Sequence, residues 1–227
     1  MVLIFDLDDT LYDELSYVRS GLQAVASFGK TAYGWNTKQS FTFMWSELQV
    51  NGRGKIFDDW LNRHGAFTKK RLEECIRVYR HHDPKIQFFP AAAQILEFYR
   101  GEVPVYVVTD GHKIVQDKKI NALGLRSLVK RAFITHRFGI RNAKPSLYCF
   151  NLIRNFEKCN WSDMVYVGDN PLKDFVNLNS VGAFTVRVVT GSHASVLVPP
   201  SHDAQAEIPD LSHLAGALTK WRSKHSN

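Results

Sequence analysis

The sequence predicts an α/β fold in which helices cover a parallel sheet, with an all-helical domain inserted near the N-terminus. Short continuous apolar runs, typical of strands buried on both faces, recur along the chain and alternate with longer segments of helical periodicity. The stretch from about Asp13 to Gln87 lacks such a run and is rich in aromatic residues. Alternating strands and helices with one long helical interruption indicate a layered α/β domain that carries an insertion.

The apolar runs predict the strands, and the segments between them predict the helices. Strands are expected at Val2 to Phe5, Val103 to Val108, Ala132 to Thr135, Met164 to Val167 and Phe184 to Val189. Helices are expected at Ala91 to Arg100, Lys113 to Leu123, Pro145 to Phe156, after Pro171, and near Leu211 to Trp221. Gly124 stands where helices commonly end, and Pro145 stands at a first-turn position. The stretch from Gly191 to Pro209 has no periodicity and is expected to be a surface connection.

These elements divide the chain into two expected domains. Residues 1–13 and 88–227 form the α/β core domain, and residues 14–87 form the inserted helical domain. The helical spacing of Trp35, Trp45 and Trp60 places most of the inserted aromatic residues in a core of their own.

The composition is that of an ordinary globular protein. Of 227 residues, 44% are hydrophobic and 22% are charged, which excludes disordered and fibrous classes. The formal net charge of +7 raises the question of an anionic partner. The basic residues are scattered and accompany no recognised binding module, so no nucleic-acid partner is expected. A small phosphorylated substrate fits this charge balance.

The sequence also favours a soluble cytoplasmic protein with no membrane partner. No apolar run reaches the roughly 18 to 20 residues that a membrane-spanning helix needs. The first residues lack the basic and long apolar regions of a signal peptide. Cys75, Cys149 and Cys159 include no closely spaced pair, which argues against a disulfide framework or a closed zinc site.

Polar side chains follow the first two predicted strands. Asp6, Asp8 and Asp9 come directly after the strand at Val2 to Phe5, and Thr109-Asp110-Gly111 follows the next strand. In open parallel sheets, ligands bind beyond the carboxyl ends of the strands, where these residues are expected to lie. Thr109 supplies a hydroxyl, and the turn at Asp110 supplies backbone amides that can hold an oxyanion.

Two further segments add a cation and more carboxylates. Lys144 precedes Pro145, which places its ammonium group just before an expected helix. Asp169 and Asp174 follow the strand at Met164 to Val167. Acidic, oxygen-rich clusters favour Mg²⁺ over zinc. A carboxylate nucleophile, a magnesium site, a cation and a hydroxyl are the groups that phosphoryl transfer requires.

In this order, the segments resemble the four motifs of the haloacid dehalogenase-like hydrolase superfamily. The motif residues here are Asp6-Leu7-Asp8-Asp9-Thr10, Thr109, Lys144, and Gly168-Asp169 with Asp174. The connecting residues Gln116 with Lys119, and Leu123-Gly124-Leu125, also match the usual pattern. The resemblance implies a Rossmann-like core and identifies the insertion as the helical cap of one large phosphatase subgroup.

The resemblance also implies a role for each motif residue. Asp6 is the expected nucleophile, and Asp8 the general acid and then base. Thr109, Asp110 and Lys144 are expected to bind phosphate. Asp6, Asp8 through its backbone carbonyl, and Asp169 are expected to hold Mg²⁺, with Asp174 orienting the ligands. The implied reaction is hydrolysis of a small phosphorylated metabolite, a sugar phosphate or a nucleoside monophosphate, through an aspartyl-phosphate.

Three alternatives remain open at the level of sequence, one of them a non-catalytic binding module, which the four filled motif positions disfavour. Within the same superfamily the chain could be a dehalogenase or a phosphonatase, although dehalogenases lack an acid at the position of Asp8. From a different class, a phosphoacceptor signalling domain also groups Asp, Thr and Lys around magnesium, but the motif order and the insertion disfavour it. A monomer or a homodimer is expected.

Overall fold

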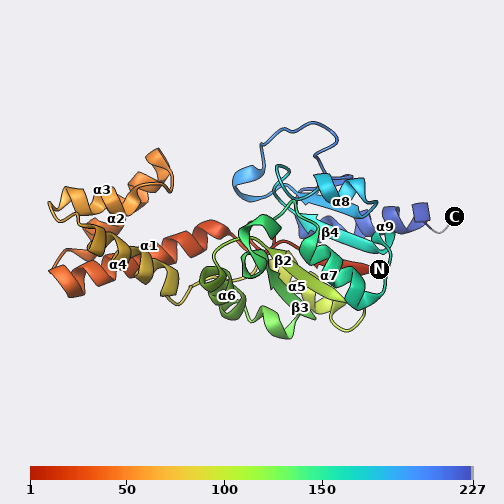
Figure 1. Ribbon diagram of the computed structural model, residues 1–227, viewed down its shortest axis with the longest axis horizontal. Coiled ribbons are helices and arrows are strands. Elements are labelled where there is room, and N and C mark those ends of the chain that lie inside the picture. The colour runs from red at the N-terminus through yellow and green to blue at the C-terminus, as the bar shows by residue number, and fades with distance from the viewer. Residues whose placement is uncertain (226–227) are drawn as a thin grey trace. The chain divides into compact units, whose positions relative to one another are not determined.

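A parallel sheet forms the centre of the α/β unit (Figure 1). The computed structural model describes residues 1–225 and contains a six-stranded sheet of order β3-β2-β1-β4-β5-β6. All of its neighbouring strands pair in parallel. The strands are β1 (Val2–Phe5), β2 (Val105–Thr109), β3 (Arg131–Ile134), β4 (Met164–Gly168), β5 (Phe184–Val188) and β6 (Ala206–Ile208). The predicted parallel α/β fold is confirmed.

The register of the sheet brings the ends of three strands together. Phe5 pairs with Val107 of β2 on one side and with Val167 of β4 on the other. The residues that follow these strands therefore emerge at the same edge of the sheet. Strand order reverses at β1, whose neighbours β2 and β4 come from opposite halves of the sheet, and such switch points open a crevice for ligands.

Helices bury the strands on both faces. The helices of this unit are α5 (Pro90–Tyr99), α6 (Lys113–Ala122), α7 (Tyr148–Glu157), α8 (Val176–Ser180) and α9 (Leu214–His225). Phe150 and Ile153 of α7 and Leu178 of α8 pack with Val2 and Ile4 in one apolar cluster. Leu3 and Phe5 alternate with these residues, point to the opposite face and are fully buried there too. Burial on both faces explains why the strands are apolar throughout.

Four helices form a second compact unit, Leu15–Ile86, while Met1–Glu14 belongs with the chain from Gln87 onward. They are α1 (Glu14–Tyr33), α2 (Thr37–Asn51), α3 (Ile56–Arg63) and α4 (Lys69–His81). The side chains of Asn36 and Thr68 accept backbone hydrogen bonds at the starts of α2 and α4. Trp60 is fully buried in the core of this unit, against Gly29, where a Cβ atom would lie 2.7 Å from the indole ring.

The structure corrects three details of the sequence interpretation. Pro145 is not in the first turn of a helix, because α7 begins only at Tyr148. The stretch from Gly191 to Pro209 is not only a connection, since it contains β6, whose three residues are too few to show a period. The last helix is a 3₁₀ turn at Leu211–His213 followed by α9, which extends to His225.

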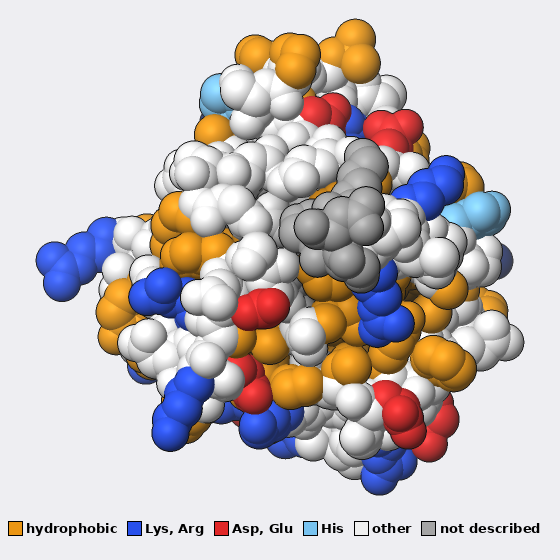
Figure 2. Space-filling model, turned by 90° about the vertical axis from the view of Figure 1, so that its right-hand side faces the viewer, with side chains coloured by type: hydrophobic (Ala, Val, Ile, Leu, Met, Phe, Trp, Pro, Cys, Tyr) orange, Lys and Arg blue, Asp and Glu red, His pale blue; other side chains and the backbone are white. Residues whose placement is uncertain are grey.

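One face of the surface carries interspersed charges (Figure 2). On the face drawn in Figure 2, Lys and Arg side chains stand apart from one another and Asp and Glu side chains lie among them. The part of this face formed by described residues therefore lacks the continuous basic patch that marks nucleic-acid-binding proteins. Among residues 1–225, every helix is too short or too polar to cross a lipid bilayer.

Candidate active site

Three carboxylates converge at the carboxyl edge of the sheet. Asp6 follows β1, and Asp169 and Asp174 follow β4; one oxygen of each lies within 4.8 Å of the others. All three side chains are buried. Gly168 makes room for this arrangement, because a Cβ atom there would stand 2.5 Å from Oδ2 of Asp174. A buried cluster of like charges thus packs directly against the backbone of Gly168.

Lys144 is the principal counter-charge of this cluster. Its Nζ lies 2.9 Å from Oδ1 of Asp6 and 2.8 Å from Oδ1 of Asp174, and its side chain is 1% exposed. The same Nζ donates a hydrogen bond of 2.9 Å to the hydroxyl of Tyr166, on β4. Sequence reasoning did not single out Tyr166, because an aromatic residue in an apolar strand is ordinarily a core residue.

The carboxylate of Asp110 fixes the backbone that carries Lys144. Oδ1 of Asp110 accepts hydrogen bonds from the backbone N–H of Lys144, at 3.0 Å, and from the hydroxyl of Thr135, at 2.7 Å. Oδ2 lies 3.2 Å from Nζ of Lys173. Lys173 adds a second ammonium group beside the site. These contacts keep Lys144 pointing at the carboxylates although no helix begins next to it.

The electrostatics of the cluster show an excess of negative charge. Burial, with further repulsion from Asp174 and Asp8, raises the pKa of Asp6 to about 6 against the pull of Lys144. Burial and the carboxylates of Asp6 and Asp174 raise the pKa of Asp169 to about 9. Burial opposes the charge on Lys144, but Asp174 and Asp6 outweigh it and raise its pKa. A cation placed among the carboxylates would relieve this repulsion.

A second polar group surrounds Asp8. Its Oδ1 accepts from Nζ of Lys119 at 2.7 Å and from the hydroxyl of Tyr12 at 2.5 Å. Its Oδ2 accepts from Nε2 of Gln116 at 2.8 Å, and the same amide contacts Oγ1 of Thr109 at 2.6 Å. Burial opposes ionisation, yet Lys119, Tyr12 and Gln116 together lower the pKa of Asp8. The two carboxylates of the first motif thus have environments that shift their pKa values in opposite directions.

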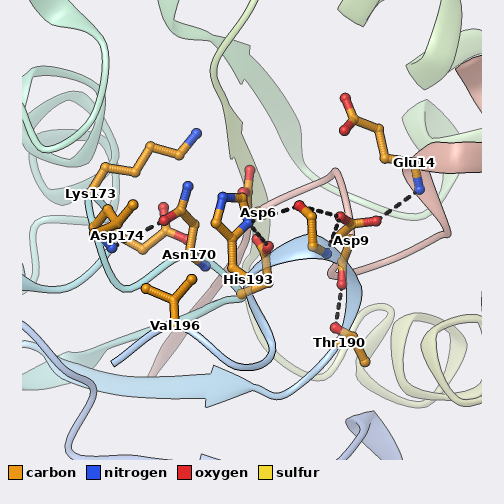
Figure 3. A network of polar contacts seen from close by, with 12 residues as sticks. Asp6, Asp9, Glu14, Asn170, Lys173, Asp174, Thr190, His193 and Val196 are labelled. Carbon is orange, nitrogen blue, oxygen red and sulfur yellow. Dashed lines mark hydrogen bonds and ion pairs between the residues drawn. The ribbon is translucent and has the colours of Figure 1, made fainter. Parts of the chain in front are cut away.

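The segment after β5 also reaches the site, as Figure 3 shows. Nδ1 of His193 lies 2.9 Å from Oδ2 of Asp169. Ser192 donates its backbone N–H to Oδ2 of Asp9 at 3.2 Å, and the hydroxyl of Thr190 donates to the backbone oxygen of Asp9. The sequence interpretation placed Gly191 and His193 in a surface connection and missed these contacts. One signal was available: the segment follows a strand at the carboxyl edge of the sheet.

The chemistry of the cluster fits a hard divalent cation. Carboxylate oxygens are the protein ligands that Mg²⁺ prefers, and here three of them gather with raised pKa values at two positions. The side chain of Asp8 lies outside this cluster, held by Lys119. The resemblance implies that Asp8 binds the metal through its backbone carbonyl, and this role stays a prediction.

The arrangement brings together the groups that phosphoryl transfer needs. Asp6 offers a carboxylate oxygen as a nucleophile, next to the ammonium group of Lys144. Asp8 offers a second carboxyl group that can carry a proton. Thr109 lies at the end of β2, linked to Asp8 through Gln116. The structure thus assembles side chains from segments that are more than a hundred residues apart in the sequence.

Comparison with known proteins identifies the family. The model of the haloacid dehalogenase-like hydrolase family matches residues 3–188, which include every predicted site residue. The chain belongs to the haloacid dehalogenase-like hydrolases. Two relatives are the glyceraldehyde 3-phosphate phosphatases of Methanocaldococcus jannaschii and Methanopyrus kandleri. Both are 26% identical to this chain; the alignments cover 84% and 92% of it, and 86% and 91% of the relatives. The predicted family and its phosphoric monoester hydrolase class are confirmed.

Solved structures of haloacid dehalogenase-like hydrolases share the fold. The HAD-hydrolase YfnB from Bacillus subtilis, a structure with bound magnesium, aligns with a TM-score of 0.68 at 18% identity, over 96% of this chain and 97% of that one. The HAD phosphatase from Thermococcus onnurineus aligns with a TM-score of 0.60 at 22% identity, with the same coverage of 96% and 97%.

Proposed function

We propose that this haloacid dehalogenase-like hydrolase is a magnesium-dependent phosphatase that acts on a small sugar phosphate. The observation that carries the proposal is the placement of Asp6. Its Oδ1 lies 2.9 Å from Nζ of Lys144, and one of its oxygens lies within 4.8 Å of carboxylate oxygens of Asp169 and Asp174. The proposed nucleophile therefore lies next to both a cationic side chain and a set of metal-binding carboxylates. The names of the two curated relatives support a small phosphorylated substrate.

In the proposed mechanism, a carboxylate oxygen of Asp6 attacks the phosphorus atom and forms an aspartyl-phosphate. Asp8 must carry a proton in the first step, although Lys119, Tyr12 and Gln116 lower its pKa in the free site; it gives this proton to the leaving oxygen, and as a carboxylate it then takes a proton from the attacking water. The leaving alcohol departs in the first step and inorganic phosphate in the second. Lys119, Tyr12 and Gln116 hold Asp8 in one orientation throughout.

Thr109 and Lys144 are the proposed ligands of the transferred phosphoryl group, together with the backbone at Asp110. Lys144 neutralises phosphoryl charge and also the carboxylate of Asp6. Asp6 and Asp169 would hold Mg²⁺ through side-chain oxygens and Asp8 through its backbone carbonyl, with Asp174 beside them. Bound there, Mg²⁺ would offset the negative charges of nucleophile and phosphoryl group, which otherwise repel one another.

The direct test is phosphate release from a panel of triose, pentose and hexose phosphates and nucleoside monophosphates, with Mg²⁺ or with a chelator. Wild type, Asp6→Asn and the surface control Lys130→Met are compared; Lys130 contacts Glu157 and is 57% exposed. We expect release that requires both Mg²⁺ and Asp6 and is unchanged in the control. A panel that includes a 2-haloacid tests the dehalogenase alternative. Halide release without phosphate release would contradict the proposal.

A further inference from the structure

We propose that His193 is a positioning residue that orients Asp169 toward the divalent cation, and that Asp9 holds the segment carrying His193. The inference rests on the proposed function, because it concerns the cation that the phosphatase would use. It goes further in assigning a task to the segment after β5, which the family motifs do not include. Figure 3 shows the histidine next to the carboxylate cluster.

The carboxylate of Asp169 depends on His193 for its orientation. Nδ1 of His193 lies 2.9 Å from Oδ2 of Asp169, and the two side chains are 30% and 4% exposed. Asp6 and Asp174 each contact Lys144 directly. Within residues 1–225, His193 is the one side chain that forms a hydrogen bond or ion pair with Asp169. Removing the imidazole therefore removes the side-chain hydrogen bond that orients this carboxylate.

The backbone around His193 is fixed by Asp9. Oδ2 of Asp9 accepts from the backbone N–H of Ser192 at 3.2 Å and from its hydroxyl at 3.4 Å. The backbone oxygen of Asp9 accepts from the hydroxyl of Thr190. Oδ1 of Asp9 accepts from the backbone N–H of Glu14 at 2.9 Å, which fixes the carboxylate from the other side.

The fit between Asp9 and this segment leaves no room for a side chain at Gly191. Gly191 has φ +64°, and a Cβ atom there would stand 2.1 Å from Cγ of Asp9. Asp9 itself has φ +52°, a left-handed conformation that non-glycine residues keep only where surrounding contacts enforce it. Asp9 lies in the same loop as Asp6, so that loop fixes both the nucleophile and the support of a metal ligand.

Hydrogen bonds of this kind affect metal binding through geometry. With Nδ1–H donating to Oδ2, the carboxylate of Asp169 is held in one orientation and loses little rotational freedom when it binds the cation. Partners that orient metal ligands typically change metal affinity by 10- to 100-fold when they are removed. His193 should therefore act on cation affinity rather than on the reacting atoms.

The test is isothermal titration of metal-free protein with Mg²⁺ in the absence of substrate. We expect His193→Ala to weaken Mg²⁺ binding by about 10-fold or more. His193→Asn should recover most of the affinity, because its amide N–H can take the place of Nδ1–H. The matched control is His213→Ala, since His213 forms a similar pair with Asp210 at 3.3 Å but is 57% exposed. This control should bind Mg²⁺ as wild type does.

A second variant tests the contact between Asp9 and the backbone at Gly191 rather than the imidazole of His193. Gly191→Ala should weaken Mg²⁺ binding in the same direction while circular dichroism shows an unchanged fold. For His193→Ala, saturating Mg²⁺ should restore kcat and leave KM for the phosphorylated substrate unchanged. Equal or tighter Mg²⁺ binding by His193→Ala would overturn the proposal. Because the titration contains no substrate, a wild type that binds Mg²⁺ but releases no phosphate would contradict the proposed function alone.

Discussion

Replacing Lys144 with Met tests whether the site is a cluster of carboxylates that needs positive charge. Met has nearly the length of Lys, so packing changes little while the ammonium group is lost. Lys144, Asp6 and Asp174 are 1%, 5% and 0% exposed, so the contacts of 2.9 and 2.8 Å are those of a buried ion pair. Removing one partner of a buried pair costs about 3 to 5 kcal/mol.

The expected loss is large enough to measure by thermal unfolding in metal-free buffer at pH 8. For a chain of this size, each kcal/mol lowers Tm by about 2 to 4 °C, so Lys144→Met should melt roughly 6 to 20 °C below wild type. Lys130→Met is the matched control: its pair with Glu157 also measures 2.8 Å but Lys130 is 57% exposed. A surface pair contributes at most about 1 kcal/mol, which limits the change in Tm to about 4 °C.

Two further conditions, added Mg²⁺ and lower pH, show whether the loss of Tm is electrostatic. Mg²⁺ should raise the Tm of Lys144→Met more than that of wild type, because the cation supplies the missing charge. The loss should shrink at pH 5.5, since Asp6, whose pKa is raised to about 6, binds a proton there. The electrostatic reasoning would be refuted if Lys144→Met had the same Tm as Lys130→Met in metal-free buffer. It would also be refuted if the loss of Tm did not change with pH.

The remaining predictions concern pH and the proton donor. In metal-free wild type, Asp6 and Asp169 have pKa values of about 6 and about 9, above the unfolded value of about 3.9, so the folded state holds protons that the unfolded state releases. The free energy of unfolding, measured with urea, should therefore fall as the pH rises from about 4 to 9 and recover with Mg²⁺ at pH 9; a flat profile would contradict these shifts. Lys119→Met removes the ion pair that orients Asp8 and also raises the pKa of Asp8, so kcat for alkyl phosphates, whose leaving group needs the proton of Asp8, should fall through lost orientation while its pH profile moves upward; formation of the enzyme intermediate from aryl phosphates should change much less. Lys119→Arg should restore part of the alkyl-phosphate activity, and equal losses for both substrate types in burst kinetics would show that Lys119 does not act through Asp8.

The sequence predicted those parts of the fold that depend on burial. β1, β2 and β4 are apolar at nearly every position because both faces of the sheet are covered, so their runs stand out. β6 was missed because Ala206–Ile208 is too short for a pattern. The sequence predicts too early a start for α7, because proline is typical of the first turn of a helix, whereas α7 begins at Tyr148 and the backbone before Pro145 is held by Asp110.

The site was predictable where strand ends determine it. Asp6, Thr109 and Asp169 directly follow or end neighbouring strands, so the order of the sheet brings them to one edge. The contacts of His193 and Tyr166 depend on side-chain directions and on loop conformation, which periodicity does not report. Asp9 illustrates the same limit, because its carboxylate supports a segment more than 180 residues away in the sequence.

The central claim is that Asp6 carries the phosphoryl group during turnover. The measurement is made with an aryl phosphate, Mg²⁺ and Asp8→Asn, because the leaving group then needs no acid while hydrolysis of the intermediate lacks its base. After an acid quench, mass spectrometry of the proteolytic peptides locates the bound phosphoryl group. We predict that it lies on Asp6 and is lost when Asp6→Asn is added to Asp8→Asn. A phosphoryl group on another residue, or one that persists in the double variant, would contradict the account.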